Sequence, residues 1–268
     1  MTPIRFMAIA AVLICALLGV LERCLAEEVS PADAAPRSRD DFHLYLLLGQ
    51  SNMAGRGKMA PADKTPAAGV LAMDAAKQWR PGAHPLHFDK PSMVGVGLGI
   101  DFAKSMRAAD ERATIGLIPC AFGGTKLDQW AKGSKLYNET VARATAGAAE
   151  GVLRGILWHQ GEGDSTAELA PTYAARLTAL IGDLRHDLDA PELPVVLGEL
   201  GHFRQEKNAF TVEINRQLAL VATEVPHVAL ASAAELRDLG DQTHFDAESL
   251  REFGRRYAVR MKQLYKGQ

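Results

Sequence analysis

The chain has 268 residues, of which 47% are hydrophobic and 23% charged, and its formal net charge is -2. This is ample for one buried core, since single α/β domains can reach roughly 200–250 residues. Lysine and arginine form no basic cluster, which argues against a nucleic-acid-binding protein.

The first 26 residues have the pattern of an export signal. Arg5 precedes an apolar segment, residues 6–21, and the small-x-small sequence Cys24-Leu25-Ala26 stands just before the acidic Glu27. The apolar segment is short for the ~20 residues that a membrane-spanning helix needs, although a retained N-terminal anchor is the alternative. We therefore predict an exported protein, periplasmic or secreted, with no stable membrane association after the signal peptide, residues 1–26, is removed.

Residues 27–41 are rich in Ala, Pro, Asp and Arg, and we expect a flexible lead-in there, followed by one domain over residues 42–268. Cys120 is the one cysteine left after removal of the signal, so the mature chain can form no intrachain disulfide. It follows an apolar run, and we interpret it as a buried, unreactive thiol rather than a nucleophile.

Five short apolar runs alternate with five helical patterns along this domain. Runs that are almost continuously hydrophobic suit strands buried on both faces of a parallel sheet. They are residues 42–48, 114–118, 153–158, 194–200 and 227–231. The helical candidates are residues 97–109, 138–149, 168–188, 206–224 and 247–265. The alternation predicts a doubly wound α/β fold with a five-stranded parallel sheet.

Residues 56–95 interrupt this alternation. They are rich in proline, so we expect a long excursion with a short helix around residues 69–77 and loop elsewhere. Because the excursion directly follows the first strand, we interpret it as one wall of a binding site.

Polar or glycine-rich sequence follows each of the five apolar runs. Ligands of an open parallel sheet bind outside the carboxyl ends of its strands, so these segments converge on one rim. They are Gly49–Asn52, Cys120–Thr125, His159–Asp164, Glu199–His202 and Asp241–His244. We therefore predict a reaction site on this rim.

Ser51 is the candidate nucleophile at this rim. It lies in a turn between Gly49 and Gly55, whose backbones tolerate tight bends. The alternative is that Ser51 and Asn52 only cap the helix that follows.

A serine hydroxyl needs a base, and His244 is the best candidate because an unperturbed imidazole titrates near neutrality. Asp241, three residues earlier, can orient the imidazole, although Asp238 and Asp246 lie close by. The oxyanion of a tetrahedral intermediate also needs hydrogen-bond donors. Our candidates for this role are the backbone N–H of Ser51, the backbone N–H of Gly123 or Gly124, and the side-chain amide of Gln160.

Four ordered sequence blocks resemble those of the SGNH hydrolase superfamily. Within it they are most similar to the sialate O-acetylesterase and acetylxylan esterase group, carbohydrate esterase family 6, over residues 42–265. The blocks are Gly49-Gln50-Ser51-Asn52-Met53-Ala54-Gly55, Phe122-Gly123-Gly124-Thr125 with Trp130, Trp158-His159-Gln160-Gly161-Glu162-Gly163-Asp164, and Asp241-Gln242-Thr243-His244-Phe245. The chain departs from this pattern with His159, where an aromatic such as Tyr is expected, and with Glu199, where Gln is common.

The resemblance implies a three-layer α/β/α sandwich with a five-stranded parallel sheet, as in SGNH and flavodoxin-like folds. It implies Ser51 as nucleophile, His244 as base and Asp241 as its partner, with Gly124 and Gln160 in the oxyanion hole. We also expect five residues of these blocks to contact substrate, namely Gln50, Asn52, Gly123, His159 and Glu162.

Other site chemistries fit the sequence less well. A paired-carboxylate glycosidase built on Glu162 and Asp164 is one alternative, although Glu162 better suits a hydrogen-bonded support of the rim. His84 and His87 lack a third ligand at suitable spacing, so we predict no metal. The Gly55-Arg56-Gly57-Lys58 run lacks the rest of a phosphate loop, so we predict no nucleotide cofactor.

The sequence thus predicts an exported serine esterase that removes O-acetyl groups from carbohydrates, of the acetylated xylan or sialic acid type, through an acetyl-serine intermediate. One alternative is a non-catalytic carbohydrate-binding protein on an esterase scaffold, and another is an esterase of small non-sugar esters. Trp130 and Trp158 suit a sugar-binding face or the core equally well. The oligomeric state is left open.

Overall fold

The computed structural model describes residues 36 and 38–267. The predicted signal peptide and most of the predicted lead-in lie outside these residues. Within them, no helix combines the length and apolar character required to cross a membrane.

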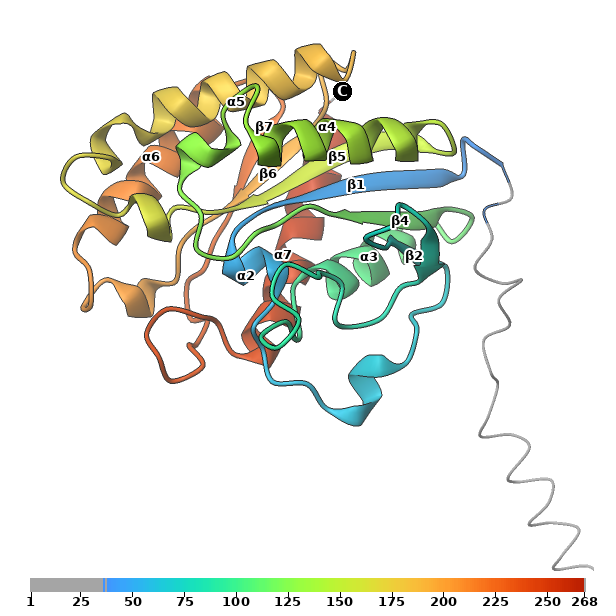
Figure 1. The fold of residues 1–268 in the computed structure, drawn as a ribbon, viewed down its shortest axis with the longest axis horizontal. Coiled ribbons are helices and arrows are strands. Elements are labelled where there is room, and N and C mark those ends of the chain that lie inside the picture. The colour runs from blue at the N-terminus through green and yellow to red at the C-terminus, as the bar shows by residue number, and fades with distance from the viewer. Residues whose placement is uncertain (1–35, 37, 268) are drawn as a thin grey trace, which may run out of the picture. The chain divides into compact units, whose positions relative to one another are not determined.

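A seven-stranded sheet forms the centre of the domain, with strands in the order β3-β2-β4-β1-β5-β6-β7 (Figure 1). β1 lies in the middle and pairs in parallel with β4 and β5, while β6 and β7 extend the sheet beyond β5. These five strands confirm the strands that were predicted from the five apolar runs. They are β1 (Phe42–Gly49), β4 (Thr114–Pro119), β5 (Val152–His159), β6 (Val195–Gly198) and β7 (Val228–Ala231).

Two further strands lie in the excursion between β1 and β4, where the prediction of a short helix around residues 69–77 is wrong. β2 (Val70–Met73) pairs in parallel with β4, and β3 (Trp79–Pro81) returns antiparallel to it. The side chain of Asp74 closes the hairpin, because its Oδ1 accepts hydrogen bonds from the backbone N–H groups of Ala76 and Gln78, each at 2.9 Å. Pairing with a neighbouring strand thus decides the conformation of a segment too short to show a periodicity of its own.

Helices cover both faces of the sheet, which makes the predicted three-layer α/β/α sandwich. Figure 1 shows α4 and α5 on one side of the sheet and α3 on the other. Residues of α4, α5 and α6 share one buried apolar cluster with the sheet, and residues of α3 and α7 share the second. The helices are α3 (Gly99–Arg107), α4 (Lys135–Ala148), α5 (Tyr173–Asp187), α6 (Phe210–Glu224) and α7 (Ala247–Lys266).

The last helix fixes the position of the loop that precedes it. Phe253 and Tyr257 of α7 are buried, and a Cβ on Gly254 would lie 2.2 Å from the carbonyl oxygen of Leu98, so this helix packs backbone to backbone near the start of α3. Asp246 begins α7 by accepting a hydrogen bond from the N–H of Ser249 at 2.7 Å. The segment just before Asp246 is therefore held at the carboxyl edge of the sheet.

Two histidines of the excursion, His84 and His87, are buried. Neither Nε2 atom has a hydrogen-bond partner among the described residues, and the same is true of His87 Nδ1. Burial disfavours the imidazolium form and lowers the pKa of each ring to about 4. Both histidines are therefore neutral in the folded protein at neutral pH.

This burial predicts acid sensitivity of the fold. The unfolded chain takes up protons at these rings near pH 6.5, whereas the folded protein does so only near pH 4, so stability falls as the pH falls between these values. A shift of this size is worth roughly 3 kcal/mol per histidine. Urea unfolding at pH 7 and pH 4.5 measures the loss. His87→Leu should reduce the pH dependence by about half, and the solvent-exposed His186→Leu should leave it unchanged.

Candidate active site

The turn after β1 places Ser51 at the carboxyl edge of the sheet. Gly49 is the last residue of β1 and has a φ of +129°, and a Cβ there would lie 2.0 Å from the carbonyl oxygen of His159. The next N–H, that of Gln50, donates to the same carbonyl at 2.9 Å. Only glycine fits this close approach, after which the chain bends sharply into the short helix α2 (Ser51–Ala54).

The structure brings Ser51, His244 and Asp241 into one hydrogen-bonded chain. His244 Nε2 lies 3.0 Å from Ser51 Oγ, and His244 Nδ1 lies 2.6 Å from Asp241 Oδ2. Asp241 Oδ1 accepts two backbone hydrogen bonds, from the N–H groups of Thr243 and His244. Partial burial raises the pKa of Asp241, but these hydrogen bonds outweigh it and hold the pKa below its usual value. The carboxylate is therefore ionised beside the imidazole.

Asp238 and Asp246 are the alternative partners for His244, but both accept hydrogen bonds from backbone N–H groups instead. Asp238 Oδ2 accepts from the N–H groups of Gly240 and Gln242, which closes the loop before His244. Asp246 caps α7. Asp241 is therefore the carboxylate that meets the imidazole.

Asn52 ties the turn of Ser51 to the loop of His244. Its Nδ2 donates to the carbonyl oxygen of Thr243 at 3.1 Å and to Glu162 Oε1 at 2.6 Å, and its Oδ1 accepts from the N–H of Phe245 at 3.1 Å. Asn52 is only 1% exposed and all of its amide groups are used within the protein. The predicted substrate contact of Asn52 is therefore replaced by a structural role.

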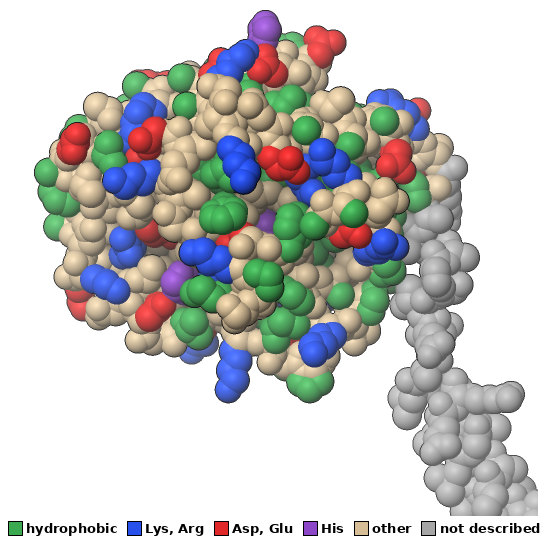
Figure 2. Space-filling view, in the orientation of Figure 1, with side chains coloured by type: hydrophobic (Ala, Val, Ile, Leu, Met, Phe, Trp, Pro, Cys, Tyr) green, Lys and Arg blue, Asp and Glu red, His purple; other side chains and the backbone are tan. Residues whose placement is uncertain are grey.

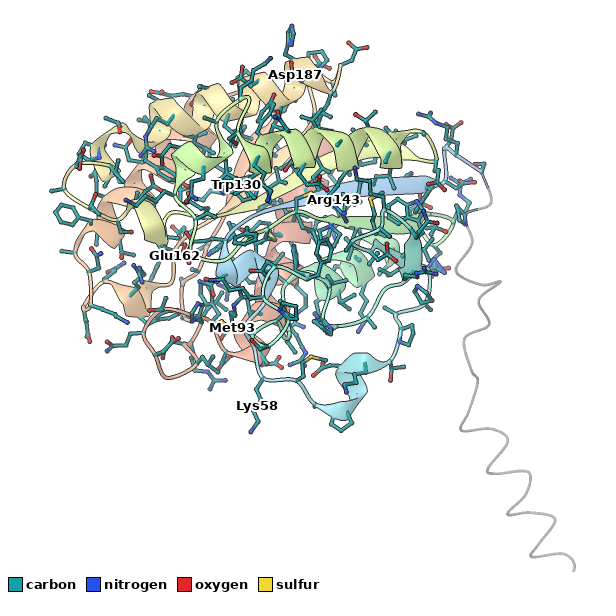
Figure 3. The ribbon with its side chains drawn as sticks, viewed as in Figure 1. Lys58, Met93, Trp130, Arg143, Glu162 and Asp187 are labelled. Carbon is teal, nitrogen blue, oxygen red and sulfur yellow. The ribbon has the colours of Figure 1, made fainter. Side chains whose placement is uncertain are left out.

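The other predicted substrate contacts also lie in the protein interior. His159 is fully buried and contacts Tyr257 through Nδ1 at 3.3 Å, and Gln50 accepts from the N–H of Gly163 at 3.3 Å. Glu162, whose place in the fold Figure 3 marks, is buried and accepts a hydrogen bond from Asn52 of α2. Burial raises the pKa of Glu162, but His159 and Asn52 outweigh this effect and lower it overall. These side chains support the rim from behind instead of facing a ligand.

The prediction that the side-chain amide of Gln160 donates to the oxyanion is wrong, because its hydrogen bonds are made within the protein. Its Nε2 donates to the carbonyl oxygen of Thr125 at 3.0 Å and to Asp164 Oδ2 at 2.7 Å, while its Oε1 accepts from Tyr173 Oη at 2.9 Å. An amide nitrogen has two hydrogens, and both are used. Asp164 also forms an ion pair with Arg176 at 2.8 Å. One carboxylate of the alternative glycosidase pair, Glu162 and Asp164, is therefore already bound by side chains of the protein.

Two of the three predicted backbone donors have no partner at this edge of the sheet. The N–H groups of Ser51 and Gly124 have no hydrogen-bond partner among the residues that the structure describes. Gly124 is exposed and has a φ of +83°, a backbone conformation that favours glycine. The N–H of Gly123, in contrast, donates to Asp89 Oδ2 at 2.8 Å. Of the predicted backbone donors, those of Ser51 and Gly124 are therefore free and that of Gly123 is not.

Sequence reasoning missed Asp89 and its partner Arg56. Asp89 lies in the proline-rich excursion, where no spacing or periodicity marks it, and Arg56 was considered only for a phosphate loop. The structure joins them in a buried ion pair at 2.8 Å. Only the proximity of Arg56 to the first sequence block could have drawn attention to it.

Cys120 and the two tryptophans considered for a sugar-binding face are part of the protein interior. Burial raises the pKa of Cys120 to about 11, as expected for an unreactive thiol. Trp130 and Trp158 are buried with their rings edge to face at 5.6 Å, so they belong to the core. Over residues 36 and 38–267, no group of three or more histidine, cysteine or acidic side chains forms a metal-binding cluster.

The chain is similar to known carbohydrate esterases in sequence and to solved structures in fold. The family model described as carbohydrate esterase, sialic acid-specific acetylesterase, matches residues 41–263. A probable carbohydrate esterase of Arabidopsis thaliana is 34% identical over 191 residues, which are 63% of this chain and 74% of the plant protein. An X-ray structure of an Arabidopsis thaliana protein superimposes with a TM-score of 0.76 at 29% identity, covering 82% of this chain and 98% of the other.

Two further solved structures share the fold at lower identity. NanS superimposes with a TM-score of 0.71 at 15% identity, covering 86% of this chain and 99% of its own. A carbohydrate acetylesterase from Xanthomonas citri gives a TM-score of 0.64 at 17% identity, covering 84% of this chain and 57% of its own.

The hydrogen bonds of Asn52 predict a large effect of its removal. Asn52→Ala leaves the buried N–H of Phe245 and the buried Glu162 carboxylate without this partner, which should cost about 2–4 kcal/mol of unfolding free energy. Asn138→Ala is the matched control, because Asn138 makes one exposed hydrogen bond to Gly133 and should lose under ~1 kcal/mol. Urea denaturation measures both, and equal losses would contradict the role assigned to Asn52.

Proposed function

Because the chain belongs to the carbohydrate esterase family of sialic acid-specific acetylesterases, we propose that it removes O-acetyl groups from carbohydrates by a serine mechanism. The observation that carries this proposal is the hydrogen-bonded chain Ser51–His244–Asp241 at the carboxyl end of β1. Such a chain activates a serine that is otherwise a poor nucleophile at neutral pH.

The proposed reaction begins when Ser51 Oγ attacks the acetyl carbonyl carbon and His244 Nε2 takes the hydroxyl proton. Asp241 accepts a hydrogen bond from His244 Nδ1 and stabilises the imidazolium that forms. The unpartnered N–H groups of Ser51 and Gly124 are the donors for the oxyanion. The C–O bond to the sugar then breaks, the sugar oxygen takes the proton from Nε2, and acetyl-Ser51 remains.

Water completes the proposed cycle. His244 Nε2 removes a proton from a water molecule, whose oxygen attacks the acetyl carbonyl carbon of acetyl-Ser51. Collapse of the second tetrahedral intermediate breaks the bond to Oγ, releases acetate and returns the proton to Ser51. The cycle consumes one water molecule and needs no cofactor.

An open pocket beside Gly123 suits the sugar part of the substrate. It has a volume of about 380 Å³, and its lining combines one exposed aromatic ring with polar side chains, as carbohydrate sites do. The lining residues are Phe122, Thr125, Gln129, Ser134, Lys135 and Leu136. Figure 2 shows small groups of exposed hydrophobic side chains among charged ones on the face of the molecule in view. We propose that Phe122, which is 42% exposed, contacts the sugar ring.

The substrate type and the location of the protein are also proposals. An acetylated xylan or an O-acetylated sialic acid is the proposed substrate, supported by the family to which the chain belongs. The proposal that the protein acts outside the cytoplasm rests on the sequence of residues 1–26.

The nucleophile is tested by Ser51→Ala. We expect this change to lower kcat for p-nitrophenyl acetate by at least about 10³-fold, because the residual rate comes only from binding and oxyanion donors. Ser105→Ala is the control and should keep full activity, since its hydroxyl bonds within α3 to the carbonyl oxygen of Asp101. A fluorophosphonate should label the wild type at the Ser51 peptide by mass spectrometry. Full activity of Ser51→Ala would rule out this mechanism.

The sugar pocket is tested by Phe122→Ala. Loss of an aromatic contact worth about 1–2 kcal/mol should raise KM for an acetylated xylooligosaccharide or O-acetylated sialic acid by roughly 5–30-fold. KM for p-nitrophenyl acetate should stay within about twofold, because this substrate has no sugar ring. Phe210→Ala, at another exposed phenylalanine, is the control. Equal effects on both kinds of substrate would contradict the proposed sugar contact.

A further inference from the structure

Asp89 lies where three segments of the chain meet. Its Oδ2 accepts the N–H of Gly123 at 2.8 Å and a guanidinium N–H of Arg56 at 2.8 Å. Arg56 follows the turn of Ser51 and also donates to the carbonyl oxygen of Gly55 at 2.9 Å. One carboxylate oxygen thus connects the excursion, the Ser51 turn and the loop after β4.

The loop held by Asp89 packs directly against the nucleophile. A Cβ placed on Gly123 would lie 2.4 Å from an Arg56 guanidinium nitrogen, 3.0 Å from Asp89 Oδ2 and 3.5 Å from Ser51 Cβ. The ion pair and Ser51 therefore all lie close to the space in which a side chain at Gly123 would sit. The next residue, Gly124, carries the exposed N–H assigned above to the oxyanion.

We propose that the Asp89–Arg56 pair is a positioning device that orients the peptide of Gly123, and through it the N–H of Gly124, for the oxyanion formed at Ser51. This inference rests on the proposed esterase function. Asp89 and Arg56 are positioning residues, because they act through the loop and neither is assigned a contact with the substrate.

Electrostatics explains why the pair has both members. A lone carboxylate beside the loop would repel the negative charge of the oxyanion, because the interior screens charge weakly. Arg56 cancels this charge, and the two side chains are only 3% and 1% exposed. Burial raises the pKa of Asp89, but the hydrogen bonds from Arg56 and Gly123 outweigh it, so the pKa lies below its usual value. The pair is therefore ionised, net neutral and suited to fixing geometry.

The chain contains a matched pair away from this loop. Asp63 accepts the N–H of Ala60 at 2.7 Å and a guanidinium N–H of Arg251 at 2.5 Å, so it also holds one backbone group and one arginine. Asp63 is in the same excursion, but its partner is on α7. Replacing Asp63 controls for the general cost of losing such a pair.

The experiment compares Asp89→Asn, Arg56→Lys and Asp63→Asn with the wild type. Two quantities are measured on each: kcat for p-nitrophenyl acetate and the inhibition constant of phenylboronic acid, whose adduct with Ser51 carries a tetrahedral anion like the oxyanion. Thermal unfolding checks that each variant is folded. Removing an oxyanion donor outright typically costs 10²–10³-fold in kcat, and a misplaced donor should cost less.

We expect Asp89→Asn to lower kcat by about 10–100-fold and to weaken boronate binding by a similar factor, with KM changed less than about threefold. Arg56→Lys should retain part of the activity, because lysine keeps the charge but not the fork of donors. Asp63→Asn should lose stability without a change in either quantity.

If folded Asp89→Asn keeps the wild-type kcat and boronate binding, the proposal is overturned. An increase in kcat would also overturn it, because the negative charge of Asp89 would then matter more than the position of the loop. If Asp89→Asn does not fold, Arg56→Lys decides: wild-type values there overturn the proposal, and a parallel loss in both quantities supports it. A wild type that neither hydrolyses esters nor binds boronate would instead refute the esterase function, and this inference with it.

Discussion

The contact between Gly49 and the carbonyl group of His159 is the constraint on which the site depends. From Tyr45 onward β1 and β5 run in register up to this pair, and the absence of a side chain lets the two backbones approach within a distance that no Cβ could occupy. The N–H of Gln50 then takes the same carbonyl oxygen, so the chain must leave the sheet there. Ser51 comes next, at the edge where β4 and β5 also end. The position of the proposed nucleophile is therefore set by the backbone of the central strands.

Behind this edge the polar residues of the sequence blocks bind one another. Asn52, Glu162 and His159 form one buried group, and Gln160, Asp164 and Tyr173 form another. Each buried amide or carboxylate left without a partner costs free energy, so these groups specify one arrangement of the loops. Many polar residues of the sequence blocks are thus required for the structure of the loops, and few of their side chains are free to contact a ligand.

The sequence predicted the sheet and the helices well because buried strands and amphipathic helices leave long hydrophobic patterns. It failed at residues 69–77, where four residues form a strand between β3 and β4 and only the partner strands decide their conformation. For the site, the residue types and their order predicted Ser51, Asp241 and His244, which the fold brings together. The spacing along the chain says nothing about which amide a neighbour has already used, so Gln160 and Asn52 received roles that their partners exclude. Asp89 had no local pattern at all.

The proposed base and the proposed nucleophile come from parts of the molecule that are built differently. Ser51 is held by the sheet, whereas His244 lies in a connection between β7 and α7 that is shaped by turns and by a single bridge from Asp238 to Phe245. Such connections accept insertions and replacements more readily than strands do. A replacement of the segment after β7 must therefore keep the backbone groups of Thr243 and Phe245 that Asn52 binds, and with these in place the proposed base can be changed while the serine turn keeps its partners.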